Sequence, residues 1–448
     1  MKPYQRDQNN STNYIHPNES NLWDLHKAME YSAVGEPVLR VNNIGGVSYS
    51  GAGNISSSSD AFGRLRVSSP YTLFDSAMRY RDDAFLWDQQ DTGAATSTHV
   101  PNESTIDMTV SGAGDESIRE TKRVFAYQPG KSLLIMSTFV MEAPIVGLRQ
   151  RVGYFGSENG IYFEQSDNEL YLVIRKNTSG VVDDTSERVA QSSWNVDRLN
   201  GEGGQYNLTG IEIDVSKTQI WWCDVEWLGV GSVRAGFVLN GQFVTCHIFH
   251  HANIFDKVYM TTATLPCRYE ITSTAASGTM KAICTTVLSE GGYLNKSFTR
   301  SASTSLAGKS LSQTVYRPLI SIRLKSSNLD SVVIPTKYDL LGLEQVAYKY
   351  ALIINPTLTG AVWTSAGSDS SVEYDITGTG LTGGTTIDTG IFVGGNKGGT
   401  ASISSGQVDF SQQIGRFLDG TSDVYVLAAI ATTNNDTAVG SLTWQEHR

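Results

Sequence analysis

The stretch from Leu208 to His251 constrains the fold most strongly, because apolar and polar side chains alternate along most of its length. A period of two is typical of a β-strand with one buried face. Asn240-Gly241 lies between two alternating runs, and this dipeptide favours a tight hairpin because both residues tolerate positive φ. We therefore predict four antiparallel strands, at residues 211–215, 220–228, 233–239 and 243–249.

Short alternating runs continue on both sides of this stretch, between about residues 85 and 341. There are more than about ten of them, roughly 8 to 15 residues apart, with no long helical period between them. The 43 glycines, against 11 prolines, and the many Ser, Thr and Asn residues supply the turns that such a chain needs. The pattern predicts an all-β protein built around a large antiparallel jelly-roll sandwich of the concanavalin type.

The pattern also divides the chain into four parts. Residues 1–59 are polar and end in a Gly/Ser-rich segment that cannot form a core alone, so they form either a disordered tail or an extended attachment arm that orders against a partner. Residues 60–84 are expected to be a connector, and residues 85–343 the large sandwich. Residues 344–448 are expected to form a smaller β-sandwich, whose charge-poor, Thr/Gly-rich edges a partner or a second copy would cover.

The charge balance excludes several classes of function. A net charge of −11 argues against nucleic acid as the main partner, because phosphate contacts need clustered Lys and Arg. No segment approaches the roughly 18 consecutive apolar residues of a membrane span. The N-terminus lacks the apolar segment of a signal peptide, so we expect synthesis in a cytoplasm even if the protein works elsewhere.

The cysteines and histidines do not show the spacing of a metal site. None of the four cysteines lies in a CxxC motif, so we predict buried free thiols and no zinc: Cys223, Cys246, Cys267 and Cys284. His247 shares strand parity with Phe249, His250 points the other way and His251 begins the next turn. We therefore expect no metal and no cofactor.

Four carboxylates in the central stretch invite comparison with glycoside hydrolases. Laminarinase-type enzymes carry Glu-x-Asp-x-x-Glu, or a form one residue shorter, on a strand, because retaining hydrolysis needs a nucleophile and a general acid. Glu212 and Asp214 match the first two acids, but the third is missing at either spacing. We interpret Glu212 and Asp214, with Asp224 and Glu226 on the next strand, as solvent-facing sheet residues, and predict that the chain is not an enzyme.

The tryptophans of the stretch are the candidate ligand or interface residues. Trp221 and Trp227 fall on one face of their strand and Trp222 on the other. Because one face must be core, we expect either Trp222 or the pair Trp221 and Trp227 to be partly exposed. Exposed tryptophan serves both sugar stacking and protein interfaces, while core packing is its commonest role.

Four further stretches carry a resemblance to a known group of proteins. They are DAFGRLRVSSPYTLFDS (60–76), LRQRVGYFGSENGIYFEQSDNELYLVIRK (148–176), DVSKTQIWWCDVEWLGVGSVRAGFVLNGQ (214–242) and TLPCRYEI (264–271). From about residue 60 onward the sequence resembles virion structural proteins of tailed bacteriophages. The resemblance implies a non-enzymatic particle component, often of a tail, baseplate or fibre, and it implies no catalytic residue.

Four hypotheses follow. The first is a virion structural protein that contacts other virion proteins through its arm and its sandwich edges and forms a homo-oligomer, with a trimer favoured. The second is a module of the same particle that binds carbohydrate or a receptor, such as a host surface glycan, through a sandwich face. A head decoration or head-fibre protein is a further alternative, and a glycosidase is the least favoured.

Overall fold

The computed structural model describes residues 70–395 and 412–447, together with the backbone of short strands at 5–6, 14–15, 38–41, 47–50 and 404–407. In this described part helical structure is limited to the 3-10 helix η1 (Gln191–Ser193) and to a 3-10 conformation at Gln412, so the expected all-β class is confirmed. No helix within these ranges is long and apolar enough to span a bilayer. The arm expected at 1–59 and most of the following ten residues lie outside the described residues, apart from β1 (Gln5–Arg6), β2 (Tyr14–Ile15), β3 (Val38–Val41) and β4 (Val47–Ser50).

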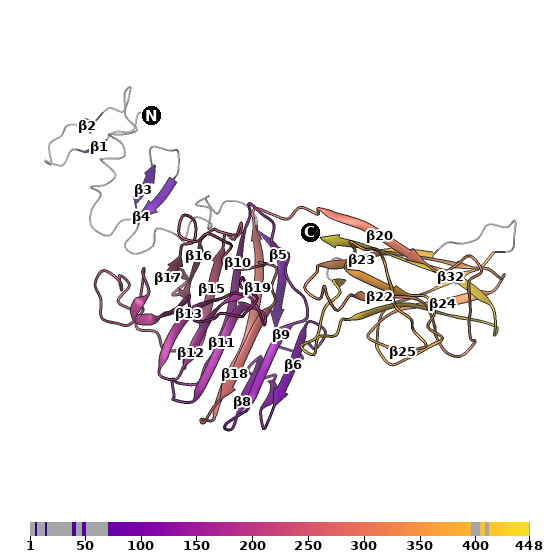
Figure 1. The fold of residues 1–448 in the computed structure, drawn as a ribbon, viewed down its shortest axis with the longest axis horizontal. Helices are drawn as coiled ribbons and strands as arrows, with labels where there is room; N and C mark the ends of the chain where they lie inside the picture. The colour runs from indigo at the N-terminus through magenta and orange to yellow at the C-terminus, as the bar shows by residue number, and fades with distance from the viewer. Residues whose placement is uncertain are drawn as a thin grey trace. The chain divides into compact units, whose positions relative to one another are not determined.

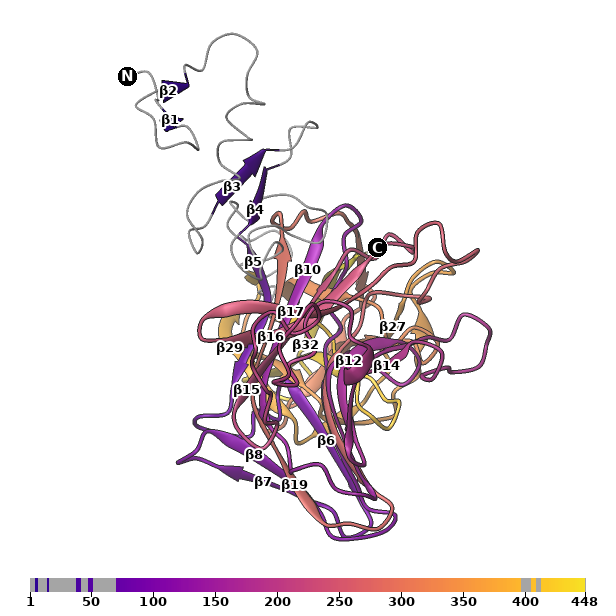
Figure 2. The same ribbon diagram turned by 90° about the vertical axis from the view of Figure 1, so that its left-hand side faces the viewer.

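The chain divides into two compact units, the first containing most residues up to Tyr293 and the second mainly Leu294–Arg448, with the short stretches Phe85–Asp88 and Glu120–Ala126. The first unit is built on two antiparallel sheets (Figures 1 and 2).

The eight-stranded sheet has the order β17-β16-β15-β10-β19-β8-β7, and β5 also pairs with β19. Its strands are β5 (Tyr71–Ala77), β7 (Thr96–Val100), β8 (Thr105–Val110), β10 (Ser132–Val140), β15 (Gln219–Val225), β16 (Val233–Leu239), β17 (Gln242–Phe249) and β19 (Gly278–Glu290). The seven-stranded sheet has the order β14-β13-β12-β11-β18-β9-β6. Its strands are β6 (Trp87–Thr92), β9 (Glu116–Thr121), β11 (Leu148–Phe155), β12 (Gly160–Ser166), β13 (Glu169–Arg175), β14 (Arg188–Ala190) and β18 (Cys267–Ser273).

Aromatic rings from the two sheets meet in the core of this sandwich. Phe163 on β12 lies 5.9 Å from Phe139 on β10 and 5.1 Å from Phe237 on β16, measured between ring centroids. Tyr269 on β18 donates its hydroxyl to the carbonyl of Cys284 on β19 at 2.9 Å. These contacts set the parity of each strand, because residues two apart share a face. The expected large jelly-roll sandwich is confirmed.

The second unit is the expected smaller β-sandwich, and its two sheets have the orders β20-β32-β23-β30, with β21 also paired to β32, and β26-β27-β22-β31-β24-β29. Its core includes Leu319, Ile322, Leu427 and Trp444, all fully buried. The strands are β20 (Ser297–Ser303), β21 (Lys309–Ser310), β22 (Arg317–Leu324), β23 (Val333–Gly342), β24 (Ala347–Ile354), β26 (Thr364–Ser365), β27 (Val372–Asp375), β29 (Thr385–Val393), β30 (Ser404–Gln407), β31 (Val424–Ala431) and β32 (Thr437–His447). A two-stranded hairpin of β25 (Thr357–Thr359) and β28 (Gly380–Thr382) completes the unit.

The second unit begins earlier in the sequence than expected. The strands β20, β22 and β23 precede residue 344, yet they pair with β31 and β32 near the end of the chain. Part of the expected connector at 60–84 likewise forms β5, which pairs with β19. Period-two alternation predicts that a strand exists but not which strand lies beside it, and for this reason the expected boundaries differ from the observed ones.

The stretch from Leu208 to His251 forms three strands rather than the expected four. The Asn240-Gly241 hairpin between β16 and β17 is confirmed, with φ of 51° and 76° at its two residues. Residues 211–215 are not a strand, although Glu212 forms one isolated bridge with Asn200. Asp214 instead accepts hydrogen bonds from the backbone N–H and the hydroxyl of Ser216, a local turn that competes with strand pairing.

Candidate functional site

The tryptophans differ from what the strand pattern suggested. Trp221 and Trp222 point to opposite faces of β15, and yet they are only 0% and 1% exposed. Trp222 packs edge-on against Phe243, with ring centroids 5.3 Å apart. Trp227 is half-buried and packs edge-on against Tyr127 at 5.6 Å. Exposure is therefore limited to Trp227, and neither Trp221 nor Trp222 offers a ring for sugar stacking.

The four carboxylates are not assembled into a catalytic pair. Glu212 and Asp214 are exposed and lie outside any strand. Asp224 is fully buried rather than solvent-facing, because the hydroxyl of Ser132 and the guanidinium of Arg234 both bind its carboxylate. The expectation of a solvent-facing side chain is therefore wrong for Asp224.

The histidines lie in separate environments. His247 packs edge-on against Phe249 at 4.5 Å, which confirms that they share a face, and it is mostly buried. His251 is fully buried, and its Nε2 lies 3.0 Å from a carboxylate oxygen of Glu187. In the part of the chain that the structure describes, no cluster of His, Cys, Asp or Glu has the arrangement of a metal site. The cysteines are free thiols, three of them buried and Cys284 half-buried, largely as predicted.

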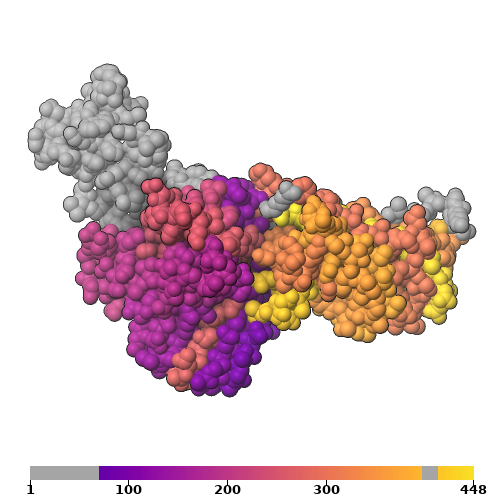
Figure 3. Space-filling view, in the orientation of Figure 1, coloured from indigo at the N-terminus to yellow at the C-terminus, as the bar shows by residue number. Residues whose placement is uncertain are grey.

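A dense cluster of charge lies on the outer face of the seven-stranded sheet, the face turned away from the core. Strand register places Arg149 and Arg151 of β11, Glu164 of β12 and Glu270 of β18 side by side on this face. Arg175 stands at the end of β13 and Arg188 at the start of β14. We call these six residues, with Arg268 of β18, the arginine face. In Figure 3 the residues of this part of the chain, in magenta, form a continuous surface.

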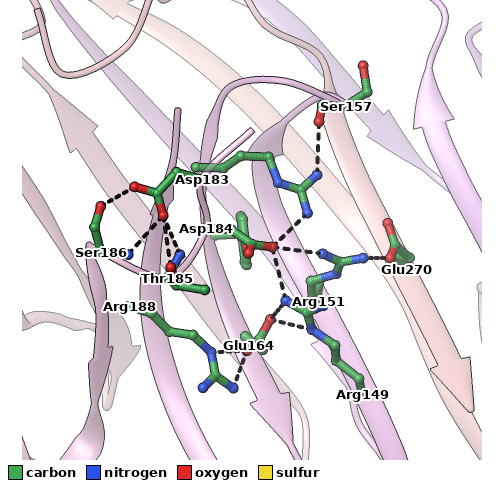
Figure 4. A network of polar contacts seen from close by, with 12 residues as sticks. Arg149, Arg151, Ser157, Glu164, Asp183, Asp184, Thr185, Ser186, Arg188 and Glu270 are labelled. Carbon is green, nitrogen blue, oxygen red and sulfur yellow. Dashed lines mark hydrogen bonds and ion pairs between the residues drawn. The ribbon is translucent and has the colours of Figure 1, made fainter. Parts of the chain in front are cut away.

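Glu164 forms the centre of the arginine face. Its carboxylate is fully buried, and Arg149 Nε donates to Oε2 at 2.6 Å while Arg188 Nε donates to Oε1 at 2.7 Å (Figure 4). The guanidinium of Arg188 also lies over the ring of Tyr171, 3.3 Å from its centroid. Both oxygens of Glu164 are therefore bound by planar, charge-assisted donors, which makes a strong and directional pair.

The connection between β13 and β14 crosses this face, and we call residues 176–187 the strap. Its two ends are held together by reciprocal backbone hydrogen bonds between Lys176 and Asp183, at 2.9 and 2.8 Å. Near its end, Glu187 binds Lys176 Nζ at 3.0 Å and His251. The tip remains exposed, with Val181 at 71% and Val182 at 44%. The strap is therefore anchored at its base and free of the core at its tip.

Asp184 of the strap inserts a single carboxylate oxygen among the arginines (Figure 4). Its Oδ2 accepts from Arg149 Nη2 and Arg175 Nη2, both at 3.3 Å, and from the hydroxyl of Tyr162 at 3.4 Å. Arg151 Nη1 lies 4.0 Å from the same oxygen. Burial raises the pKa of Asp184, but the charges of Arg149 and Arg175 outweigh this effect and the net pKa is lowered. The carboxylate is therefore ionised at neutral pH.

Positive charge exceeds negative charge on the arginine face. Glu270 is bound by Arg151 and, at 2.6 Å, by Arg268. The cluster therefore holds five guanidinium groups (149, 151, 175, 188, 268) and three carboxylates (164, 184, 270). Burial, reinforced by the neighbouring Arg149 and Arg175, lowers the pKa of Arg151 to about 10, which still leaves it charged at neutral pH.

Aromatic rings lie among these charges. Phe155 and Tyr162 pack at 4.6 Å between centroids and form a small buried cluster with Val173, against which Tyr171 packs. The guanidinium of Arg175 lies 5.5 Å from the Tyr162 ring centroid and that of Arg151 lies 5.7 Å from it. Arginine and aromatic groups at such distances attract each other. The face thus combines guanidinium groups with aromatic rings.

The sequence pattern alone does not place these arginines and carboxylates together. They lie between positions 149 and 270, and only the registers of β11, β12, β13 and β18 bring them together. The Arg-x-Arg spacing of Arg149 and Arg151 within an alternating run is a signal that two cations share one strand face.

No family model and no curated protein matches the sequence. Among solved structures, an endo-acting O-glycanase of the human gut microbiota is similar at 9% identity, with a TM-score of 0.33, over 49% of this chain and 99% of that chain. A legume lectin-like domain from Entamoeba histolytica is similar at 10% identity and a TM-score of 0.31, over 49% and 98%. A mixed-linkage glucan hydrolase of Bacteroides ovatus is similar at 10% and 0.31, over 48% and 99%. At these identities and scores, none of them bears on what this chain binds.

Proposed function

We propose that this chain is a non-enzymatic structural component of a tailed-phage virion, placed in its tail, baseplate or a fibre. The placement rests on the four stretches that resemble virion proteins. The absence of catalysis is supported by one observation: the buried acids on the sheets of the large sandwich are bound by strong donors. Glu164 and Asp224 are buried against guanidinium groups, whereas a general acid for hydrolysis must deliver a proton to a bound substrate.

An exposed sheet edge supports assembly. The strand β29 is the last strand of its six-stranded sheet and pairs only with β24 among the described strands. Its side chains Ile391 and Val393 are 74% and 52% exposed, and Asp388 is its one charged residue. Long, charge-poor edges of this kind pair readily with another chain. We propose that the sandwich edges, with the N-terminal arm, contact other virion proteins and join copies of the chain, as a trimer.

Particles test the main proposal. Purified phage that encodes this chain should contain it in fixed stoichiometry, and chemical cross-linking with mass spectrometry should join it to tail, baseplate or fibre proteins. Cross-links to head proteins alone would favour a head decoration or head fibre, and absence from particles would overturn the proposal. Light scattering after size-exclusion chromatography should give a trimer, and a monomer at micromolar concentration would contradict the oligomer.

A test of hydrolysis completes this set. The purified chain should release no reducing ends from a panel of polysaccharides. Cleavage that Glu212→Gln abolishes would overturn the non-enzymatic assignment, because Glu212 is the carboxylate that matches the first acid of the laminarinase-type motif.

A second function, glycan binding on the particle, is favoured by the arginine face. The half-buried Tyr171 shares this face with Arg149 and Arg188, a combination that suits the ring and the polar groups of a saccharide. A glycan array with the whole chain tests it. Saccharide binding that Arg188→Gln weakens would support it, and a complete lack of binding would remove it.

A further inference from the structure

The guanidinium groups of the anion site belong to strands of the sheet, but the carboxylate that they bind belongs to the strap. Arg149, Arg151 and Arg175 belong to β11 and β13, whereas Asp184 belongs to the strap. Among the described residues, the polar contacts of Asp184 all go to one oxygen, Oδ2, and its side chain remains 27% exposed. A planar carboxylate normally uses both oxygens when it meets an arginine fork. The strap therefore fills the site incompletely.

Unused donors in the same place form an independent observation. Arg151 is only 7% exposed, and its Nε and Nη1 have no hydrogen-bond partner within the described residues. Arg175 is equally buried, and its Nε has no such partner either. Buried donors are almost always satisfied in native proteins, so the unused donors of Arg151 and Arg175 indicate that Asp184 leaves part of their hydrogen-bonding capacity unfilled.

The surroundings suit a sugar rather than a bare anion. Beneath the strap, Phe155 and Tyr162 pack with tilted rings beside Arg175, and both are fully buried while Asp184 occupies the site. A ligand that carries both a ring and a carboxylate would use both kinds of contact once the strap lifts. A guanidinium fork matches the two oxygens of a carboxylate more closely than the single oxygen that Asp184 supplies.

We propose that Arg149, Arg151 and Arg175 form a binding site for the carboxylate of an acidic saccharide, such as a uronic or sialic acid, and that Asp184 of the strap occupies this site in the free chain. The inference rests on the glycan-binding function proposed above and names its ligand class. Binding displaces Asp184 and lifts the strap, because both carboxylates claim the same donors. The contacts of Glu187 with Lys176 and His251 keep the C-terminal end of the strap in place.

The test is the variant Asp184→Asn in the full-length chain. Calorimetry with trigalacturonate and with sialyllactose should show at least about tenfold tighter binding than in the wild type, because the internal competitor is gone. Methyl-esterified trigalacturonate and lactose, which lack the charge, should bind both forms equally. Adding Arg149→Gln to Asp184→Asn should remove the gain.

The matched control is Asp183→Asn. This residue is also a strap carboxylate, but its oxygens accept from Thr185 and Ser186 and not from the arginines. An equal gain in Asp183→Asn would show that a loosened strap, not a vacated anion site, is responsible, and it would overturn the proposal. If Asp184→Asn does not fold, wild-type chain at millimolar trigalacturonate should exchange amide hydrogens faster in residues 177–186, and unchanged exchange there overturns the proposal equally.

The outcomes distinguish failure of the carboxylate site from failure of the proposed glycan-binding function. Neutral glycans that bind without preference for acidic ones would leave glycan binding in place and overturn the carboxylate site. No binding of any saccharide, to wild type or to Asp184→Asn, would overturn both.

Discussion

Glu164 in the first unit and Asp375 in the second are both buried carboxylates, at 0% and 1% exposure, yet they are stabilised by different donors. Glu164 binds two guanidinium groups from β11 and β14. Asp375 instead accepts from the hydroxyl of Thr377 and from the backbone N–H groups of Val362, Thr377 and Gly378. The first arrangement joins distant strands through full charges, and the second closes a turn through dipoles.

The difference shows what each site is suited to. Backbone N–H groups cannot leave Asp375, so that carboxylate is a fixed part of a turn. Burial raises the pKa of Asp375, but the donors of Thr377 and its neighbours outweigh this effect and the net pKa is lowered. Guanidinium groups on the arginine face are shared among several acids and exceed them in number, which is the arrangement that the proposed replacement of Asp184 by an outside carboxylate requires. Sharing of this kind is what a binding site requires and a structural turn does not.

The largest expected effect comes from Glu164→Gln. Removing one charge leaves Arg149 and Arg188 facing each other without their common anion, and breaking a buried pair in this way costs about 3–5 kcal/mol of unfolding free energy. Hydrogen exchange in urea should show the loss in peptides from β11 to β13. Glu158→Gln, in the exposed turn between β11 and β12, is the control and should change little. A loss of unfolding free energy below about 1 kcal/mol would contradict the interpretation of Glu164 as the anion of a strong buried ion pair.

We expect the free energy of unfolding of the first unit to depend on pH through His247, which has no arginine partner among the described residues. Burial, with a smaller effect from His250, lowers the pKa of His247 to about 4, and its Nδ1 accepts the N–H of Asn195 at 3.2 Å, which requires the neutral ring. The stabilisation is thus complete above about pH 6.5 and is lost as the pH falls toward 4, up to about 3 kcal/mol. The second unit's His447 also has a lowered pKa because of burial.

The measurement compares wild type with His247→Asn, whose side-chain oxygen keeps an acceptor near the Asn195 N–H. Urea unfolding of the first unit at pH 7 and pH 4.5 should show a drop that is about 2–3 kcal/mol larger in wild type. An equal drop in both proteins would mean that other groups cause the acid sensitivity.

Local features of the fold were predictable from the sequence. The Asn240-Gly241 turn needs positive φ at two adjacent residues, and this dipeptide supplies it. Asp375 precedes Thr377 and Gly378, which is the spacing of a side chain that closes its own turn. In both cases most of the partners are neighbours in the sequence, although Asp375 also accepts from the N–H of Val362, 13 residues earlier.

Features that depend on pairing between distant strands were not predictable. Trp221 and Trp222 alternate on β15, and the pattern implied one exposed face, but both faces of the strand are covered. The sequence pattern predicts a surface position for Asp224, but pairing of β15 with β16 places Arg234 against its carboxylate. The arginine face is the clearest case, because it requires the register of four strands and the path of a connection between two of them.

A smaller loss is expected from Asp375→Asn. The amide keeps one oxygen acceptor but turns its NH2 toward backbone N–H groups, so about one or two hydrogen bonds are lost, worth about 1–2 kcal/mol. Hydrogen exchange in β22 and β27 should report it, with the exposed Asp330→Asn as the control. A loss as large as that of Glu164→Gln would break the distinction between charge-based and dipole-based carboxylate sites.

The smallest effect concerns two buried indoles, one in each unit. Trp444 Nε1 donates to Glu446 at 2.9 Å, whereas Trp222 Nε1 has no partner within the described residues. Trp444→Phe and Trp222→Phe remove the same ring volume, so the cavity cost is similar and the difference between them reports the hydrogen bond. We expect Trp444→Phe to cost about 1 kcal/mol more than Trp222→Phe, measured by hydrogen exchange within each unit. An equal cost would mean that the Trp444 hydrogen bond adds nothing to stability, and a larger cost for Trp222→Phe would mean that its N–H has a partner of its own. The outcome thus reports whether a neutral donor contributes to the stabilisation of Glu446, as neutral donors do for Asp375.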